Sequence, residues 1–240
     1  MSNTNYVLLA KQQANLIHMD RVADNMANAN TVGFKSEHDV FKSHLVPIKN
    51  GENISYGTFG FTRRDASTGP MQVTERPLDV AIQGTGFFKV QTPQGERYTR
   101  AGNFAIDNDG RLVTQDGYAV MGAGGGGVNL LPEDTNISIR DDGTVFSGEN
   151  ERGRIGVFDV GDPQELTRVG NNLLLSSSGD SLSESSVLQQ GMLEGSTVSA
   201  VTEMSQMISA SREYQLINGL LRQLQGVSSQ MGQRLVNAQV

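Results

Sequence analysis

The last 44 residues decide the fold, and from Thr197 to Val240 they read TVSAVTEMSQMISASREYQLINGLLRQLQGVSSQMGQRLVNAQV. The stretch contains no proline, so nothing in it must interrupt a helix. Apolar residues recur at alternating steps of three and four, the a/d spacing that places them on one line of an α-helix. This seam consists of Met207, Ala210, Tyr214, Ile217, Leu221, Leu224, Ser228, Met231, Leu235 and Ala238. Only Ser228 interrupts the apolar line, so the spacing predicts one long helix with a narrow apolar face that must pack against another element.

The start of the chain repeats this pattern. Residues 3–30 are predicted to form a helix that ends at Gly33, the first glycine in the chain, in a left-handed turn. Its apolar stripe consists of Leu9, Leu16, Met19, Ala23 and Met26, with Gln12 as a polar exception in the same rhythm. Each stripe is too narrow to form a globular core by itself. We therefore expect the two end helices to pack against each other, antiparallel and coiled-coil-like.

The middle of the chain has a different composition. All six prolines lie between Pro47 and Pro163, and most of the glycines are there too. Residues 36–73 show no sustained period and are predicted to be an extended connector with one or two short strands. Short strand patterns separated by turn residues follow, which is typical of antiparallel hairpins. Residues 176–190, rich in Ser, Gly and Asp, are predicted to be a return linker.

The predicted fold class is α+β: long terminal helices packed antiparallel, with an antiparallel β domain inserted between them. The expected organisation is a helix in 1–35, a connector in 36–73, a β-rich domain in 74–186 and the C-terminal helix in 187–240.

Composition excludes several classes of protein. The chain has no Cys, which removes disulfides and thiolate metal sites. Its net charge of −7 is concentrated in the middle, because both ends are nearly neutral, and this argues against nucleic acid as a partner. No apolar run approaches the ~20 residues that a membrane helix needs. The N-terminus lacks a basic region followed by an apolar core, so we expect no cleaved secretory signal.

No motif in the sequence indicates catalysis or cofactor binding. His18, His38 and His44 lack the spacing of metal ligands. The glycine-rich run at 122–127 lacks the Lys-Ser/Thr pair of a phosphate-binding loop and is predicted to be a hairpin loop. The turns at 108–110 and 141–143 lack the acid that opens a calcium loop. We therefore expect no catalytic residue, no cofactor and no metal, and no enzyme activity.

Four stretches carry a resemblance to a known family. The stretch DNMANANTVGFK at 24–35 resembles the N-terminal signature of the bacterial flagellar rod and hook proteins, although Asp24 stands where the family has Asn. RPLDVAIQGTGFF at 76–88 and YTRAGNF at 98–104 are similar to the family's β domain. QGMLEGSTV at 190–198, followed by Glu203-Met204 and Arg212-Glu213-Tyr214, resembles its final signature, with Thr197 in place of an Asn. The matches cover both ends and the middle in the right order.

The resemblance implies a structural subunit of a hollow, helical drive shaft. Within the family the chain looks most like the proximal-rod member, because the connector after Lys35 is short. The implied partners are other copies of the chain, other flagellar rod proteins and the flagellar export apparatus. The implied location is the basal-body rod in the periplasm, reached without a cleaved signal peptide.

The residues expected to serve in assembly come from both end helices and from the N-terminal signature. They are Leu9, Leu16, Met19, Asn25, Met26, Asn28, Thr31, Gly33, Phe34, Met207, Tyr214, Ile217, Gly219, Leu221, Leu224, Gly226, Met231 and Leu235. Gly219 and Gly226 lie seven residues apart on a line that faces away from the seam. They are interpreted either as room for the helix of a neighbouring subunit or as tolerated flexibility.

Other functions fit the same sequence. A distal-rod or hook protein of the same family differs in the length of its connector. A secreted hydrolase acting on cell-wall glycan needs two carboxylates across a cleft, which a sequence does not reveal. A closed coiled-coil oligomer with a β head is a third possibility, and light scattering separates it from a polymer.

Overall fold

The computed structural model describes residues 3–47, 53–131, 136–183 and 185–237 of the 240, and side chains at 6–40, 42, 60–131, 136–183 and 185–226. The chain forms two units. The helical unit comprises residues 1–27, 37–63 and 199–240, and the β unit comprises residues 28–36 and 64–198. Both ends of the chain therefore belong to one unit, although almost the whole sequence separates them.

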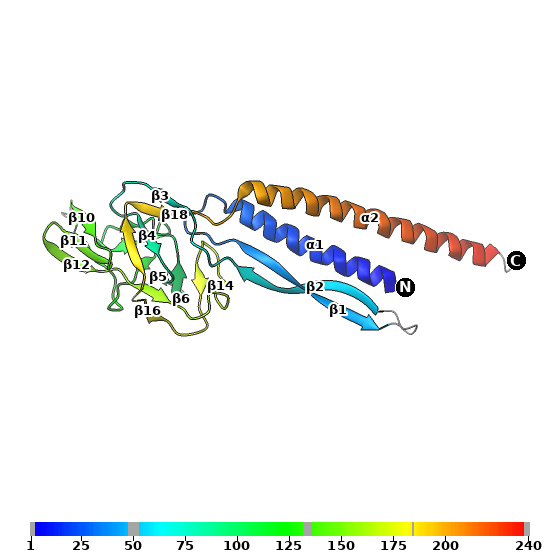
Figure 1. The fold of residues 1–240 in the computed structure, drawn as a ribbon, viewed down its shortest axis with the longest axis horizontal. Helices are drawn as coiled ribbons and strands as arrows, with labels where there is room; N and C mark the ends of the chain where they lie inside the picture. Colours follow the sequence, from blue (N-terminus) through cyan, green and yellow to red (C-terminus); the bar gives the residue numbers. More distant parts are fainter. Residues whose placement is uncertain (1–2, 48–52, 132–135, 184, 238–240) are drawn as a thin grey trace. The chain divides into compact units, whose positions relative to one another are not determined.

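Two helices build most of the helical unit. α1 spans Asn3–Ala27 and α2 spans Ala200–Asn237, and they lie side by side in Figure 1. Lys11 pairs with Glu213 at 2.7 Å, and the Asn15 side-chain amide donates to the Ala210 carbonyl at 2.9 Å. The partner number falls as the α1 number rises, so the helices run antiparallel. α2 is 38 residues long and α1 is 25, so α2 has about 20 Å of additional length and runs past the start of α1 (Figure 1).

A strand pair completes the helical unit. β1 spans Glu37–Pro47 and β2 spans Asn53–Arg64, and the two strands pair with each other. The first residue of β1 is fastened to α1, because the Asn25 side chain donates to the Glu37 carbonyl and accepts from the Glu37 amide. The strands are 11 and 12 residues long, so residues 36–73 hold longer strands than the short ones expected there.

The largest sheet of the β unit has nine strands. Its printed order along one path is β14-β15-β6-β5-β9-β8-β7, with β13 pairing to β5 and β16 pairing to β13, and the pairs are antiparallel. The strands are β5 (Phe87–Thr92), β6 (Gly95–Thr99), β7 (Ala105–Ile106), β8 (Leu112–Val113), β9 (Ala119–Val120), β13 (Val157–Asp159), β14 (Thr167–Arg168), β15 (Leu174–Leu175) and β16 (Ser181–Leu182). The antiparallel hairpins predicted from the turn residues are thus present.

Three smaller sheets complete the unit. β10 (Ile137–Ile139), β11 (Thr144–Ser147) and β12 (Asn150–Arg154) form one antiparallel sheet. β4 (Val80–Gln83) pairs with β17 (Val187–Gln190), and β3 (Met71–Val73) pairs with β18 (Met192–Glu194). The last two pairs join segments more than a hundred residues apart in sequence.

The core of the β unit lies between these sheets. Its main cluster takes alternate residues of the strands, and β5 is buried on its other face too, where Phe87 belongs to a second cluster. Phe88 and Phe104 are fully buried in it and meet edge to face, with ring centroids 5.0 Å apart and an interplanar angle of 79°. Val90, Leu112, Leu130 and Ile155 belong to the same cluster.

Two boundaries differ from expectation. Residues 176–190 hold β16 and β17 rather than a return linker. Residues 187–194 also belong to strands, so α2 begins at Ala200 rather than within the expected span from 187. The reason is long-range pairing: β17 and β18 are stabilised by backbone bonds to β4 and β3, and local composition carries no sign of those partners.

Candidate assembly surfaces and the joined chain ends

The predicted seam of α2 lies on the inner face of the helix pair. Ala210 and Ile217 are buried, and Met207, Tyr214, Leu221 and Leu224 are half-buried. The side chains of Met231 and Leu235, also predicted to belong to the seam, lie outside the described residues. Over the described side chains, the a/d line is therefore the covered face of α2.

Polar contacts accompany the apolar ones along this seam. The Gln12 amide donates to the Asn218 side chain at 2.9 Å. The Tyr214 hydroxyl lies beside both, and hydrogen bonds from Asn218 and Gln12 lower the pKa of Tyr214. Gln12, the one polar member of the predicted α1 stripe, thus has a partner on α2.

The covered face of α1 is not its apolar stripe. Asn15, Val22 and Asn25 are buried, whereas Leu9 and Leu16 are 49% and 42% exposed. Met19 and Met26 are half-buried, and Ala23 is exposed. The buried line lies one residue before the apolar one, because Asn15 reaches the Ala210 carbonyl and Asn25 binds β1. An apolar line at steps of seven residues therefore stays open on α1.

A second apolar stripe lies on the outer face of α2. At 100° per residue it falls opposite the seam. Its members are Val201, Met204, Ile208, Leu216 and Leu220, each exposed by 48% or more. Large exposed apolar stripes of this kind mark interaction surfaces on soluble proteins. Over its described side chains α2 therefore has two apolar faces, of which the seam is covered and the outer stripe is exposed.

Gly219 and Gly226 lie on exposed positions of α2. A Cβ added at either glycine meets no other part of the described chain within 4 Å. The fold of this chain therefore does not itself require glycine at these positions, and their role in subunit contacts stays a prediction.

The residues of the N-terminal signature make contacts inside the chain. Asn25 binds the backbone of Glu37, as described above. Asn28 ends α1, because its carbonyl accepts from the Thr31 amide at 3.1 Å and its side chain accepts from the Thr31 hydroxyl at 3.1 Å. These contacts give the signature a role in ending the helix and starting β1.

Gly33 and Phe34 are buried in the β unit. Gly33 has a φ of +68°, and an added Cβ would come within 3.0 Å of the Arg100 and Ala101 backbone, so only glycine fits there. The Gly33 amide donates to the Glu194 carbonyl at 2.7 Å. Phe34 is 1% exposed and lies under the guanidinium of Arg168, 4.2 Å from the ring centroid. The N-terminal segment is thus an integral part of the β unit.

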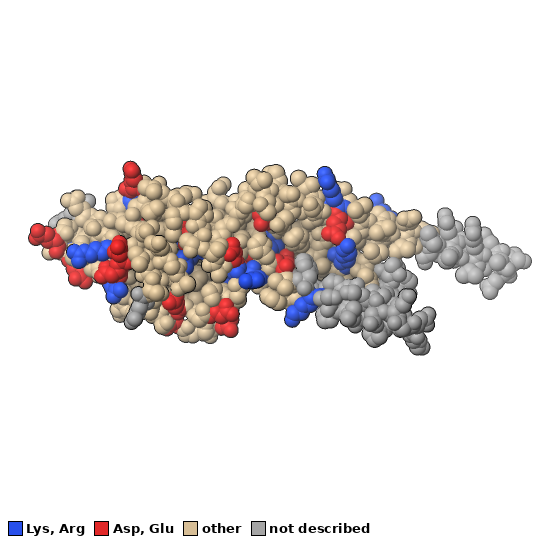
Figure 2. All heavy atoms as spheres, in the orientation of Figure 1, with Lys and Arg blue, Asp and Glu red and all other residues tan. Residues whose placement is uncertain are grey.

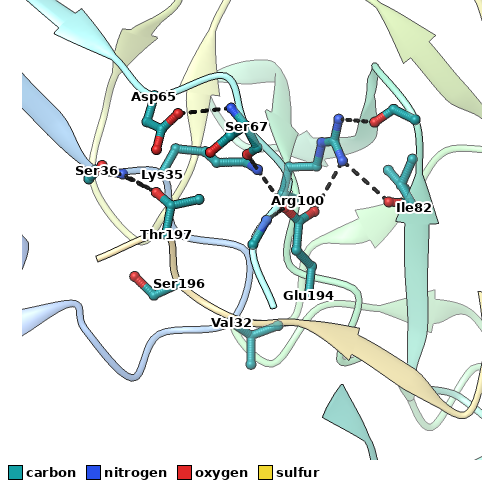
Figure 3. A network of polar contacts seen from close by, with 12 residues as sticks. Val32, Lys35, Ser36, Asp65, Ser67, Ile82, Arg100, Glu194, Ser196 and Thr197 are labelled. Carbon is teal, nitrogen blue, oxygen red and sulfur yellow. Dashed lines mark hydrogen bonds and ion pairs between the residues drawn. The ribbon is translucent and has the colours of Figure 1, made fainter. Parts of the chain in front are cut away.

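Three charged side chains, which we call the ionic clasp, meet beside this segment. They are Lys35, Arg100 and Glu194, all at least nine-tenths buried, and Figure 3 shows them converging from three parts of the chain. The Glu194 carboxylate accepts from the Lys35 ammonium, from Arg100 Nη1 at 3.1 Å and from the Gly69 amide at 2.8 Å. Burial lowers the pKa of Lys35 and of Arg100, although the Glu194 charge opposes this in both.

The clasp includes residues that the sequence analysis named only as parts of motifs. Lys35 is the last residue of the signature at 24–35, Arg100 lies within the block at 98–104, and Glu194 lies within the signature at 190–198. The signal available in the sequence was a charged residue directly beside glycine or phenylalanine in a family signature. It does not reveal the partner, because 158 residues stand between Lys35 and Glu194.

The described residues hold no group of three or more His, Asp or Glu placed to bind a metal ion. Among the described helices, none is both long enough and apolar enough to cross a membrane. On the face drawn in Figure 2, acidic and basic side chains are interspersed and no extended basic patch is visible. The acidic composition and this distribution give no support for a nucleic-acid partner.

These features define a class: an α+β protein that brings its two ends together and keeps apolar helix faces uncovered. Three protein-family models match this chain. They are the flagellar basal-body rod protein model at residues 10–35, the D1 domain of the flagellar hook protein FlgE/F/G at 81–147, and the C-terminal region of flagellar basal-body rod FlgEFG proteins at 189–218.

Whole-chain relatives agree with the family models. The chain is 35% identical to the flagellar basal-body rod protein FlgF of Caulobacter vibrioides, over 98% of both chains. It is 30% identical to FlgG of the same organism, over 87% of this chain and 88% of the relative. FlgG of Bacillus subtilis is 32% identical over 91% and 92%. The chain belongs to the flagellar basal-body rod protein family, and the hydrolase alternative receives no support from these comparisons.

Proposed function

We propose that this chain is a structural subunit of the flagellar basal-body rod, at the proximal position that FlgF-type members take. In this proposal the subunit assembles helically into the hollow shaft that transmits torque and through which export occurs. Its partners are further copies of itself, other rod proteins and the flagellar export apparatus. It leaves the cytoplasm by that apparatus, and its role in the rod is structural.

The uncovered apolar faces are the observation that carries this proposal. The inner seam of α2 meets α1 within the chain, while the outer stripe through Ile208 and Leu216 stays exposed. Leu9 and Leu16 are likewise exposed on α1. When the exposed outer stripe of one chain meets a different surface of the next, the contact is heterologous, and repeated heterologous contacts that do not close produce a helical filament.

Coiled-coil-like packing is part of the proposal. The seam keeps its three-four spacing through Leu235, beyond the length that α1 can cover. In this proposal α2 packs against helices of other subunits, and Gly219 and Gly226 allow such a helix to approach closely.

The proximal position is favoured by the match within one organism. FlgF of Caulobacter vibrioides is more similar to the chain than FlgG of that organism, in identity and in coverage. The second candidate is the distal rod, because FlgG of Bacillus subtilis is also 32% identical over nine-tenths of both chains.

Locating the protein in purified basal bodies tests the position. A tagged chain replaces the chromosomal copy in its host, and the basal bodies are imaged with a probe for the tag. We expect the tag in the rod, on the side nearer the cytoplasmic membrane. A tag found in the hook or outside the basal body would overturn the proposal, and a tag at the far end of the rod would select the distal candidate.

Charge placed on the outer stripe tests the surface. Ile208→Asp puts a carboxylate on a side chain that is 48% exposed, so the isolated chain should keep its fold while incorporation into rods falls. Leu182→Asp is the matched control, because Leu182 on β16 is 43% exposed and the change in chemistry is the same. Equal incorporation of both variants would show that the outer stripe of α2 is not a subunit contact.

A further inference from the structure

We infer that the ionic clasp couples two segments, and we call this coupling the latch. The buried Glu194 carboxylate has its full set of ionic and hydrogen-bond partners only when the N-terminal segment 28–36 and strand β18 are packed together, so each segment stabilises the position of the other. The inference concerns contacts inside the β unit and stands whether or not the chain is a rod subunit.

The carboxylate of Glu194 is the centre of the latch. It is fully buried and has cations on two sides, Lys35 from the N-terminal segment and Arg100 from the end of β6. A buried charge is costly unless it is paired and hydrogen-bonded. Glu194 meets that requirement with three donors, and each comes from a different part of the chain.

The cations are held by other contacts as well. The Lys35 ammonium also donates to the Ser67 carbonyl, and Arg100 Nη2 donates to the Gly84 carbonyl at 2.8 Å. These carbonyls position the cations, but they carry no negative charge. The clasp has two cations and one anion, so removal of the anion leaves two like charges buried beside each other.

Backbone bonds join the same segments in parallel with the charges. The Gly33 amide donates to the Glu194 carbonyl, and the Thr197 amide donates to the Phe34 carbonyl at 3.0 Å. The Ser36 amide donates to the Thr197 hydroxyl at 2.8 Å, and the Asp65 amide donates to the Ser36 carbonyl at 2.9 Å. Figure 3 shows Ser36, Asp65 and Thr197 around the clasp.

Charged and backbone contacts therefore join three segments, 33–36, 65–69 and 194–197, with Arg100 as a further charged partner of Glu194. If segment 33–36 separates from the unit, Glu194 loses Lys35 and the Thr197 amide loses its acceptor, the Phe34 carbonyl. Undocking the last removes the only anion of the clasp from two buried cations. Because such a coupling free energy is reciprocal, the order of β18 depends on the N-terminal segment as strongly as the reverse.

Amide hydrogen exchange of the full-length chain, followed residue by residue, tests this coupling. Glu194→Gln keeps the shape of the side chain and removes the charge. We expect the Gly33 and Ser36 amides to exchange about tenfold faster or more, within the usual range of coupling factors. The Val90 amide in β5 reports global unfolding of the β unit, so its exchange shows how much stability the whole unit loses in the same variant.

A second substitution separates charge from shape. Adding Lys35→Met to Glu194→Gln removes the excess buried cation, so the double variant should exchange at Gly33 more slowly than Glu194→Gln alone. Asp107→Asn is the control, because it neutralises an acid of an exposed ion pair with Arg111 in the same unit. It should leave Gly33 and Ser36 unchanged.

The reverse direction is read at the Gly195 amide, which donates to the Pro70 carbonyl and not to the N-terminal segment. Phe34→Ala loosens that segment without removing a member of the clasp, so we expect faster exchange at Gly195. Unchanged exchange at Gly33 in Glu194→Gln would overturn the latch. So would failure of Lys35→Met to slow exchange in the double variant.

Discussion

Gly33→Ala tests whether the N-terminal segment is packed into the β unit as tightly as the structure indicates. An alanine at a φ of +68° is strained by about 1–2 kcal/mol. Alanine also lowers the conformational entropy of the unfolded chain, which stabilises the folded state by about 0.4–1 kcal/mol and offsets part of the strain. At Gly33 the new Cβ would also lie against the backbone of Arg100 and Ala101, which must move. Overpacking of this kind adds about 1–3 kcal/mol.

Gly117→Ala is the matched control. Gly117 belongs to the same unit and has a φ of +82°, but a Cβ added there meets nothing within 4 Å. It therefore carries the backbone strain without the collision. The difference between the two variants should isolate the collision, with Gly33→Ala less stable by about 1–3 kcal/mol.

The measurement is urea unfolding followed by far-ultraviolet circular dichroism, together with exchange of the Val90 amide as a reporter of the β unit alone. The two units need separate reporters because a single transition cannot be assumed for a chain with two compact parts. Equal free energies of unfolding for Gly33→Ala and Gly117→Ala would refute the close packing of the N-terminal segment against Arg100.

Three further predictions concern the helices and the clasp. Ile217→Ala should lower the free energy of unfolding of the helical unit by about 2–5 kcal/mol, because Ile217 is buried, and Leu221→Ala, half-buried, should cost less in the isolated chain; denaturant titration of helicity measures both. Replacing both Gly219 and Gly226 with Ala should stabilise the helical state of α2 by about 1 kcal/mol per site, and so raise the helicity of the isolated chain, yet impair rod assembly. Intact assembly would contradict the hypothesis that these glycines let a neighbouring helix approach closely. Burial lowers the pKa of Lys35, so the unfolded chain binds more protons between that lowered value and the ordinary one near 10.5; relative to Lys35→Met, the wild type should gain stability as pH rises through this window and lose it as pH falls.

Local patterns in the sequence predicted the elements well where the pattern was long. The three-four spacing from Met207 onward predicted α2, and the covered face of that helix carries the predicted residues as far as side chains are described. The turn residues at 108–110 and 141–143 predicted hairpins, and β7–β8 and β10–β11 flank them. These signals succeed because helix periodicity and turn geometry depend on neighbours in the sequence.

Local patterns failed where a partner lay far away. β17 and β18 fall in a stretch that composition assigns to a linker and a helix, and their partners β4 and β3 lie more than a hundred residues earlier. The covered face of α1 was displaced from its apolar stripe for a related reason: polar contacts of Asn15 and Asn25 with distant backbone outweigh the apolar pattern.

The sequence by itself determined that both ends are helices, that the middle is β, and that its signatures belong to flagellar rod proteins. Tertiary structure alone decided which face of α1 is covered, and that Lys35, Arg100 and Glu194 share one buried site. The physical reason is the distance along the sequence over which each interaction acts. Helical period and turn preference act over a few residues, whereas the pairing of buried charges depends on which distant segments the folded chain brings into contact.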